Sequence, residues 1–344
     1  MRFTLIVIFI IQFPLYGCSI GYVLKQGISQ LDVHFTSIPA EVILADKNVP
    51  ENEKNKIRLI QDIKTFAETK IGLTPTNNYT RFYDVKNNAI AYNVTACRKD
   101  KFEPYIWSFP IVGELPYKGF FSIQDAEMEK EQLQSMGYDT TLQKVAGYST
   151  LGWFNDPIFS TMLKYSDAEL TNLIIHELTH STIYVTGNAE FNESVASFIG
   201  EQGALQFLKE RFGELSDEYK YLVNYINDNK LFSDFISRWY DKLNNLYNSN
   251  ISPEDKIANR ELIFREIIGE FKSLKPKLRT TALNGFENIV LNNAEILAHL
   301  RYNRYTVYED IFAKLDDILS FVAVAKMASL EKDPIEYLKN FRVR

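Results

Sequence analysis

The pentapeptide His176-Glu177-Leu178-Thr179-His180 holds the residues of this chain best suited to chemistry. An α-helix turns once in about 3.6 residues, so two histidines four positions apart project from one face, one turn apart. Imidazole nitrogens at this spacing can share a tetrahedral zinc ion, and a glutamate beside them can accept a proton from zinc-bound water. The pentapeptide therefore predicts a zinc site at His176 and His180, with Glu177 as the general base.

A catalytic zinc site needs a third protein ligand as well as an open position for water. Three glutamates follow the pentapeptide closely: Glu190, Glu193 and Glu201. We favour Glu193, because Asn192-Glu193-x-x-Ala196 resembles the helix that supplies the glutamate ligand in gluzincin peptidases. Twelve residues separate His180 from Glu193, fewer than in thermolysin-like or aminopeptidase N-like enzymes. Glu201 would give a spacing nearer theirs and remains the alternative ligand.

Apolar residues flank the pentapeptide on both sides, at positions 173–175 and 183–185. Such flanks are typical of a helix that is buried rather than one that lies on the surface. Buried ionisable groups need partners, and a metal ion provides one for two histidines and a glutamate together. The alternative, a chance HExxH string on a solvated helix, does not explain these flanks.

The elements that must position these residues are helices. Ser166 and Glu169 form a capping-box pattern ahead of the pentapeptide, and that helix is expected to end at Gly187. Asn188 can cap a second helix over 189–211, antiparallel to the first. Further helices are expected in these segments: 21–45, 51–71, 124–136, a short one from Asp156-Pro157, 216–247, 253–274 and 307–320.

Between residues 79 and 149 the sequence becomes rich in aromatic and β-branched residues, interrupted by Asn, Gly and Pro. This pattern favours strands, which we place at 80–85, 89–94, 105–112, 118–123 and 140–149. They predict a small, mostly antiparallel sheet. Residues 147–154, just before the zinc helix, are a candidate edge strand that pairs with extended substrate, or plain core.

The composition sets the size and excludes one class of partner. The chain has 344 residues, 46% of them hydrophobic and 14% aromatic, which is enough for one large domain or two closely packed ones. A net charge of -6 and the lack of a long basic stretch argue against nucleic acid as a partner. We expect three parts: a signal peptide at 1–17, N-terminal helices, sheet and zinc-binding helices at 18–213, and a helical C-terminal subdomain at 214–344.

The N-terminus predicts export. An apolar run at 3–13 is too short to cross a bilayer and typical of a signal-peptide core. It leads into Leu15-Tyr16-Gly17-Cys18, which resembles a bacterial lipobox, so we expect a lipid on Cys18 that anchors the protein in the bacterial cell envelope. An ordinary buried strand or a short anchor is the alternative. With Cys18 lipidated, Cys97 has no intrachain disulfide partner.

The chain also resembles a known family, the predicted aminopeptidases of bacteria, which are zinc-dependent and often lipoproteins. The resemblance covers essentially the whole mature chain and rests on FPIVG at 109–113, PYKGFF at 116–121, GYSTLGWFNDP at 147–157, the HELTH helix, and FNES at 191–194. It implies an α+β, zincin-like (gluzincin) fold and hydrolysis of peptide bonds. It also implies Zn²⁺ as the cofactor and a peptide as the substrate.

A peptidase of this kind needs a donor for the tetrahedral oxyanion. Tyr302, Tyr305 and His299 are the candidates, since they follow Asn292-Asn293-Ala294, a stretch that is also similar in the family. The sequence shows no Gly-x-Met-Glu-Asn signature for a free α-amino group. Exo- and endopeptidase action thus both stay open.

Two other functions compete with a zinc peptidase. A non-catalytic envelope lipoprotein would use the metal for structure or for binding a partner, but such a site has no need of Glu177. A cytosolic helical protein with an accidental pentapeptide would keep its N-terminus unprocessed.

Overall fold

The computed structural model of this chain describes residues 19–86, 89–109, 112–145, 147–151, 154–300, 306–315 and 317–342. Within them the protein is a mixed α+β structure, mostly helical, with small sheets. The predicted signal peptide, Cys18, Tyr302 and Tyr305 lie outside the described residues.

Helices and short strands alternate in the first part of the chain. The helices there are α1 (Ser19–Thr36), α2 (Ala40–Ala45), α3 (Glu51–Phe66) and α4 (Ile123–Ser135). The strands are β1 (Ile38–Pro39), β2 (Arg81–Tyr83), β3 (Ala91–Cys97), β4 (Trp107–Phe109), β5 (Gly113–Leu115), β6 (Lys118–Phe120), β7 (Asp139–Val145) and β8 (Ile158–Phe159).

The second part is helical. It comprises α5 (Asp167–His180), α6 (Ala189–Phe212), α7 (Asp217–Tyr247), α8 (Pro253–Leu274), α9 (Asn293–Leu300), α10 (Thr306–Leu315), α11 (Ile318–Ala328) and α12 (Pro334–Asn340). Serine caps start three of these helices, because the side chains of Ser166, Ser216 and Ser252 accept a hydrogen bond from the third backbone N–H group.

The strands form three small sheets rather than the single sheet that the sequence predicts. One is ordered β1-β2-β8 and contains a parallel pair, one is the antiparallel sheet β6-β3-β7, and one is the hairpin β4-β5. In the antiparallel sheet β3 pairs with β7 over seven residue pairs, from Ala91↔Val145 to Cys97↔Asp139. This sheet is the one that faces the candidate site.

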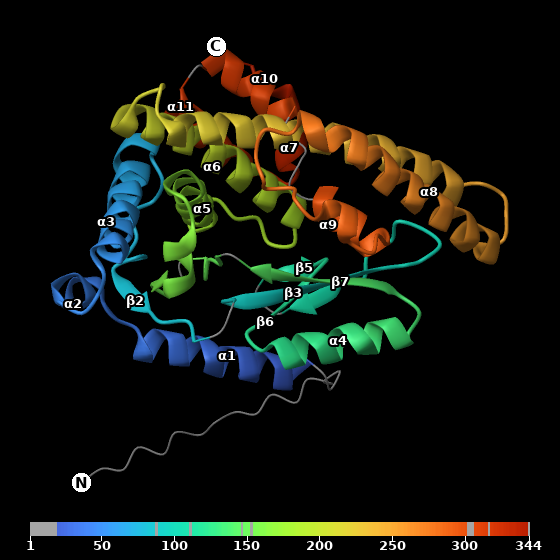
Figure 1. Cartoon of the computed structure of the whole chain (residues 1–344), viewed down its shortest axis with the longest axis horizontal. Coiled ribbons are helices and arrows are strands. Elements are labelled where there is room, and N and C mark those ends of the chain that lie inside the picture. The colour runs from blue at the N-terminus through green and yellow to red at the C-terminus, as the bar shows by residue number, and fades with distance from the viewer. Residues whose placement is uncertain are drawn as a thin grey trace, which may run out of the picture.

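The two faces of the sheet β6-β3-β7 have different neighbours. Helix α4 packs on one face, where Tyr92, Val94 and Ala96 join a small apolar core. On the opposite face, α9 covers the end of the sheet near Asp139, whose carboxylate accepts a hydrogen bond from the backbone of Asn293. Figure 1 shows the sheet between α4 below and α9 above, with α7 and α8 crossing the top of the molecule.

The helices that carry the pentapeptide and the candidate third ligand lie in the largest apolar core. This core contains residues of α3, α5, α6, α10 and α11, so that it draws on both halves of the chain. A second core joins the C-terminal half of α7 to α8 and α9. The division of the chain at residue 213 stays a prediction.

Several predicted helices have other boundaries in the structure. The segment 21–45 is divided into α1 and α2, because Ile38 and Pro39 form a strand between them. The segment 307–320 is likewise divided, and Asp317 caps α11 through the backbone N–H groups of Leu319 and Ser320. The pentapeptide helix ends at His180 instead of continuing to Gly187.

The predictions around Asp156 were wrong. Asp156 starts no helix: it precedes β8, and its buried carboxylate accepts hydrogen bonds from Thr150. Residues 147–151 and 154 contain no strand either, so the expected edge strand is absent from the described part of 147–154. None of the described helices combines the length and the apolar character needed to cross a membrane.

Candidate metal centre

Close packing between α5 and α6 sets the frame of the site. Gly200 and Gly203 of α6 face α5, and a Cβ atom at Gly200 would lie 2.7 Å from Oδ1 of Asn172 and 3.2 Å from Cβ of His176. At Gly203 a Cβ atom would lie 3.2 Å from Ile175. The two glycines therefore allow α6 to approach the pentapeptide helix more closely than larger residues would.

The loop between these helices reverses the chain over residues 181–188. The carboxamide of Asn192 holds it at both backbone groups of Val185, accepting from N–H at 2.8 Å and donating to C=O at 2.9 Å. Asn188 caps α6 through the backbone N–H of Phe191, as the sequence predicted. These bonds place Glu193 one turn into α6, opposite the two histidines.

The side chains of His176, His180 and Glu193 converge. The two Nε2 atoms are 3.2 Å apart, and Oε2 of Glu193 is 3.7 Å from Nε2 of His176 and 3.8 Å from Nε2 of His180. Zinc bonds of 2.0–2.2 Å in a tetrahedron require ligand atoms about 3.3–3.6 Å apart. The three atoms thus have nearly the separations that a shared zinc ion needs, and they are of the types that zinc prefers.

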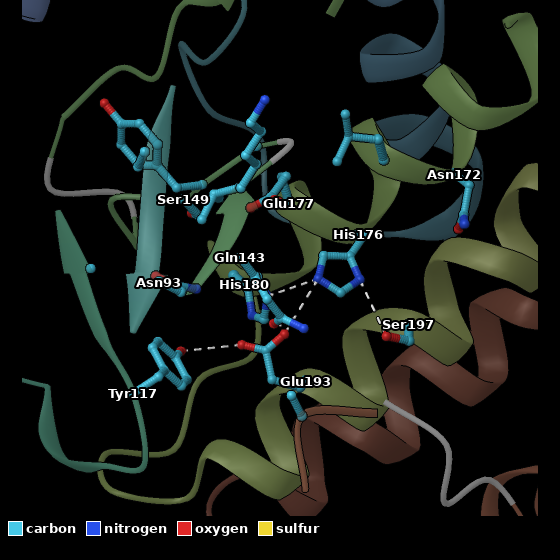
Figure 2. A pocket seen from close by; sticks show the side chains of 18 of the residues that line it. Asn93, Tyr117, Gln143, Ser149, Asn172, His176, Glu177, His180, Glu193 and Ser197 are labelled. Carbon is cyan, nitrogen blue, oxygen red and sulfur yellow. Dashed lines mark hydrogen bonds and ion pairs between the residues drawn. The ribbon is translucent and has the colours of Figure 1, made fainter. Parts of the chain in front are cut away.

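Figure 2 shows this convergence together with two further side chains. Oγ of Ser197 lies 3.5 Å from Nδ1 of His176, on the ring edge away from the other two groups. The hydroxyl of Tyr117 donates a hydrogen bond of 3.3 Å to Oε1 of Glu193. Each contact leaves the converging atom free and fixes the orientation of the group that carries it.

The electrostatics favour a neutral His180. Burial lowers the pKa of its imidazole from 6.5 to about 4. Burial also acts to lower the pKa of His176, but the hydrogen bond with Glu193 and the charges of Glu177 and Glu193 outweigh it, so that this pKa is raised. Metal ligands must be deprotonated, and His180 meets this condition at neutral pH.

Glu177 is buried beside the histidines, with an exposed fraction of 7%. Burial raises the pKa of its carboxyl from 4.5 to about 7, and the charges of Glu193 and Asp156 raise it further against the effect of His176. A carboxyl with a pKa near neutrality is suited both to accept and to return a proton. Gly147 leaves the space that this carboxylate fills.

A buried polar network holds the segment that contains Gly147. Asp156 accepts hydrogen bonds from both the backbone and the hydroxyl of Thr150, and its own N–H donates to Oδ1 of Asn78. The carboxamide of Asn78 also donates to Ser181, which directly follows His180. The network thereby ties Thr150 and Asp156 to the end of the pentapeptide helix.

A cavity of about 1190 Å³ opens beside the three converging side chains. Helices α5, α6 and α7 line one side of it, and the sheet β6-β3-β7 lines another through Ala91, Asn93 and Gln143. The cavity is large enough to hold several residues of an extended chain, since ligand pockets of roughly 300–1,000 Å³ hold drug-sized molecules.

The remaining sequence candidates lie around this group. Glu201, the alternative ligand, is buried in the cavity wall two turns after Glu193, and burial raises its carboxyl pKa to about 8. Glu190 is exposed at the start of α6. His299 lines the cavity from α9, with Nε2 3.4 Å from the carboxylate of Glu295. Of the glutamates considered, Glu193 is the one in the converging group.

The sequence reasoning missed several residues that line the site. Ser197 could have been found, because it follows Glu193 by four positions and so shares its helix face. Asn93 and Gln143 come from strands far away in sequence, and Tyr117 comes from the connection between β5 and β6; only the tertiary fold brings them to the helices. Cys97 is buried, and it forms no disulfide in the described part of the chain.

The comparisons with known proteins give one result. A family model described as "Putative aminopeptidase" matches residues 21–337, which is most of the chain, so the chain belongs to that family. No curated protein matches the chain. No solved structure matches it either.

Proposed function

From membership of the putative aminopeptidase family, we propose that this protein is a zinc-dependent peptidase with a gluzincin-type site. The observation that carries the proposal is the convergence of His176, His180 and Glu193, at nearly the mutual separations that a shared zinc ion needs, beside the buried carboxyl of Glu177. A zinc ion held there would act as a Lewis acid and lower the pKa of a bound water.

Several residues of the chain would then each have a role in the reaction. Glu177 would accept a proton from the attacking water and return it to the leaving amine, for which a pKa near 7 is well matched. Ser197 would hold the His176 ring through Nδ1, and Tyr117 would hold the outer oxygen of Glu193. Tyr302 and Tyr305 remain the proposed oxyanion donors.

Metal analysis of the purified protein tests the site and the choice of ligand. We expect about one zinc per chain in the wild type and in Glu201→Ala, and a large loss in Glu193→Ala. Equal zinc content in all three proteins would contradict the assignment of Glu193. Loss in Glu201→Ala alone would move the third ligand to Glu201.

Hydrolysis of a peptide library tests the chemistry. Glu177→Gln should keep its zinc and lose at least about a thousandfold in kcat/KM, because the proton acceptor is gone. A zinc-loaded Glu177→Gln protein as active as wild type would overturn the mechanism. A zinc-loaded wild type that cleaves no peptide would instead support a structural or partner-binding metal site in an envelope lipoprotein.

We also propose that a lipid on Cys18 attaches the protein to the bacterial envelope membrane. Helix α1 begins one residue later and exposes a line of apolar side chains, Ile28, Leu31 and Phe35. A protein held at Cys18 would keep this helix near the bilayer. Mass spectrometry of the mature N-terminus should show a lipid-modified Cys18, whereas an intact Met1 would contradict the anchor.

A further inference from the structure

Two carboxamide side chains lie side by side on the sheet face that borders the cavity. Asn93 of β3 and Gln143 of β7 are directly paired across the antiparallel ladder, and Gly119 of β6 is the next residue in the same row. Cross-strand partners project to the same face of a sheet. Asn93 and Gln143 both line the cavity together with His176, His180 and Glu193, and Figure 2 shows them with these residues.

Neither carboxamide is used by the fold. In the described ranges of the chain, no hydrogen bond or ion pair is formed by the side chain of Asn93 or Gln143, although both are partly buried. The polar atoms of both carboxamides are accessible from the cavity. Two carboxamides with free donors and acceptors in one wall of a cavity are therefore available to a ligand that enters it.

The Asn93 carboxamide lies against bare backbone in this row. Gly119 carries no side chain, and a Cβ atom there would be in tight contact with Oδ1 of Asn93, at 3.3 Å. Ala91 and Val145, the next pair on the same face, are small or apolar and form the adjoining wall. The carboxamides thus lie next to apolar residues on this face of the sheet, opposite the helices.

The chemistry of the pair suggests what the ligand is. A carboxamide has one acceptor oxygen and two donor hydrogens, so that it can bond both the N–H and the C=O of a peptide group. It carries no charge, so it offers no strong partner to a charged terminus or side chain. We propose that Asn93 and Gln143 bind the main chain of the peptide substrate beside the scissile bond, independently of its side chains.

This proposal rests on the proposed peptidase function, because it assigns these two residues to positioning the same substrate. Its test is therefore made by binding rather than by turnover. The full-length, zinc-loaded Glu177→Gln protein is titrated with tetraalanine and with variants that carry leucine, phenylalanine, lysine or glutamate at one position. The tightest binder is then made in three further versions, each with one amide N–H replaced by an ester oxygen.

An ester removes one main-chain donor with little change in shape. In the Glu177→Gln protein, one of the three esters should bind about fivefold more weakly than the parent peptide, as expected for one lost hydrogen bond. Adding Gln143→Leu or Asn93→Leu should weaken the binding of the parent peptide by a similar factor. It should also abolish the difference in affinity between the parent peptide and that ester. Gln132→Leu, an exposed position on α4, serves as the matched control and should leave the difference intact.

Other results would contradict either the proposed role of the carboxamides or the proposed peptidase function, and they distinguish between the two. If the ester still binds more weakly than the parent peptide in both Gln143→Leu and Asn93→Leu, the proposed main-chain role is wrong. Equal binding of all four peptides, or no binding of any of them, would also contradict it. Esters that bind as proposed, with no hydrolysis by the wild type, would keep the role of the carboxamides and remove the peptidase. Circular dichroism and zinc content confirm that the variants are folded.

Discussion

Gly147 and the catalytic candidate Glu177 are in direct contact across 30 positions of sequence: a methyl group at Gly147 would lie 2.9 Å from Oε1 of Glu177 and 3.2 Å from its Cγ. The bare backbone at residue 147 is thus one wall of the space in which the carboxylate is held. The buried network of Asp156, Thr150 and Asn78 keeps that wall in place.

Gly147→Ala should reduce peptidase activity without loss of metal. The added methyl must displace the Glu177 carboxylate, and a displacement of about 1 Å can cost on the order of a hundredfold in rate. The measurement is kcat/KM at equal zinc content. Gly269→Ala, where nothing lies within 4 Å of the added atom, is the control. Unchanged activity in Gly147→Ala would show that the wall is not needed.

Ser197→Ala should weaken zinc binding while leaving the three proposed ligands intact. Its hydroxyl is the partner of His176 Nδ1 at 3.5 Å, and removal of such outer partners typically costs about 10–100-fold in metal affinity. Competition with a chromophoric chelator gives the zinc dissociation constant. Ser135→Ala, on the exposed side of α4, should not change it. Equal affinities in the two variants would contradict the orienting role.

Gly200→Ala should destabilise the protein, although alanine is the better helix former. The new Cβ would lie 2.7 Å from Oδ1 of Asn172 and force α5 and α6 apart, at a cost of about 1–3 kcal/mol. Gly269→Ala, in the open part of α8, should instead stabilise by about 0.5–1 kcal/mol. Urea denaturation of both variants gives the two free energies of unfolding, and the same sign in both would contradict close packing at Gly200.

Glu201→Gln should alter how stability depends on pH. Burial raises the carboxyl pKa of Glu201 from 4.5 to about 8, so the folded state favours the protonated form. That contribution to stability is complete below pH 4.5 and is lost as the pH rises through 8. Glutamine cannot ionise. The metal-free variant should therefore gain stability relative to wild type between pH 5 and pH 9, by at most about 5 kcal/mol.

Chemical denaturation at the two pH values measures this gain for Glu201. Glu210→Gln, an exposed site on the same helix, provides the comparison and should show a nearly constant difference from wild type. A constant difference for Glu201→Gln as well would mean that this carboxyl ionises as easily in the folded protein as in the unfolded one.

The features that depend on interactions between residues close in sequence were predicted well. The Ser166 capping box, the Asn188 cap and the periodicity between them place α5 and α6, and the group His176, His180 and Glu193 follows because these residues are close along the chain. Local signals also favoured a longer helix after His180. There the bonds between Asn192 and Val185 hold the loop in another conformation.

The features that could not be predicted from the sequence depend on contacts between segments that are distant along the chain. Tyr117 reaches Glu193 across 76 positions, and Asn93 meets Gln143 only because β3 and β7 pair. Nothing in the neighbours of these residues along the chain indicates such a partner. The division into three sheets has the same origin, since β2 pairs with β8 rather than with the strands that follow it.

Helix α6 is supported by residues that lie more than one hundred positions later in the sequence. The hydroxyl of Ser194, the residue after Glu193, contacts that of Tyr308 at 2.8 Å, and the ring of Phe198 lies 4.8 Å from that of Phe321. During synthesis, both histidines and Glu193 emerge from the ribosome more than one hundred residues before these partners. A growing chain that has reached only α6 would hold all three candidate ligands and still lack Tyr308 and Phe321, against which their helix packs.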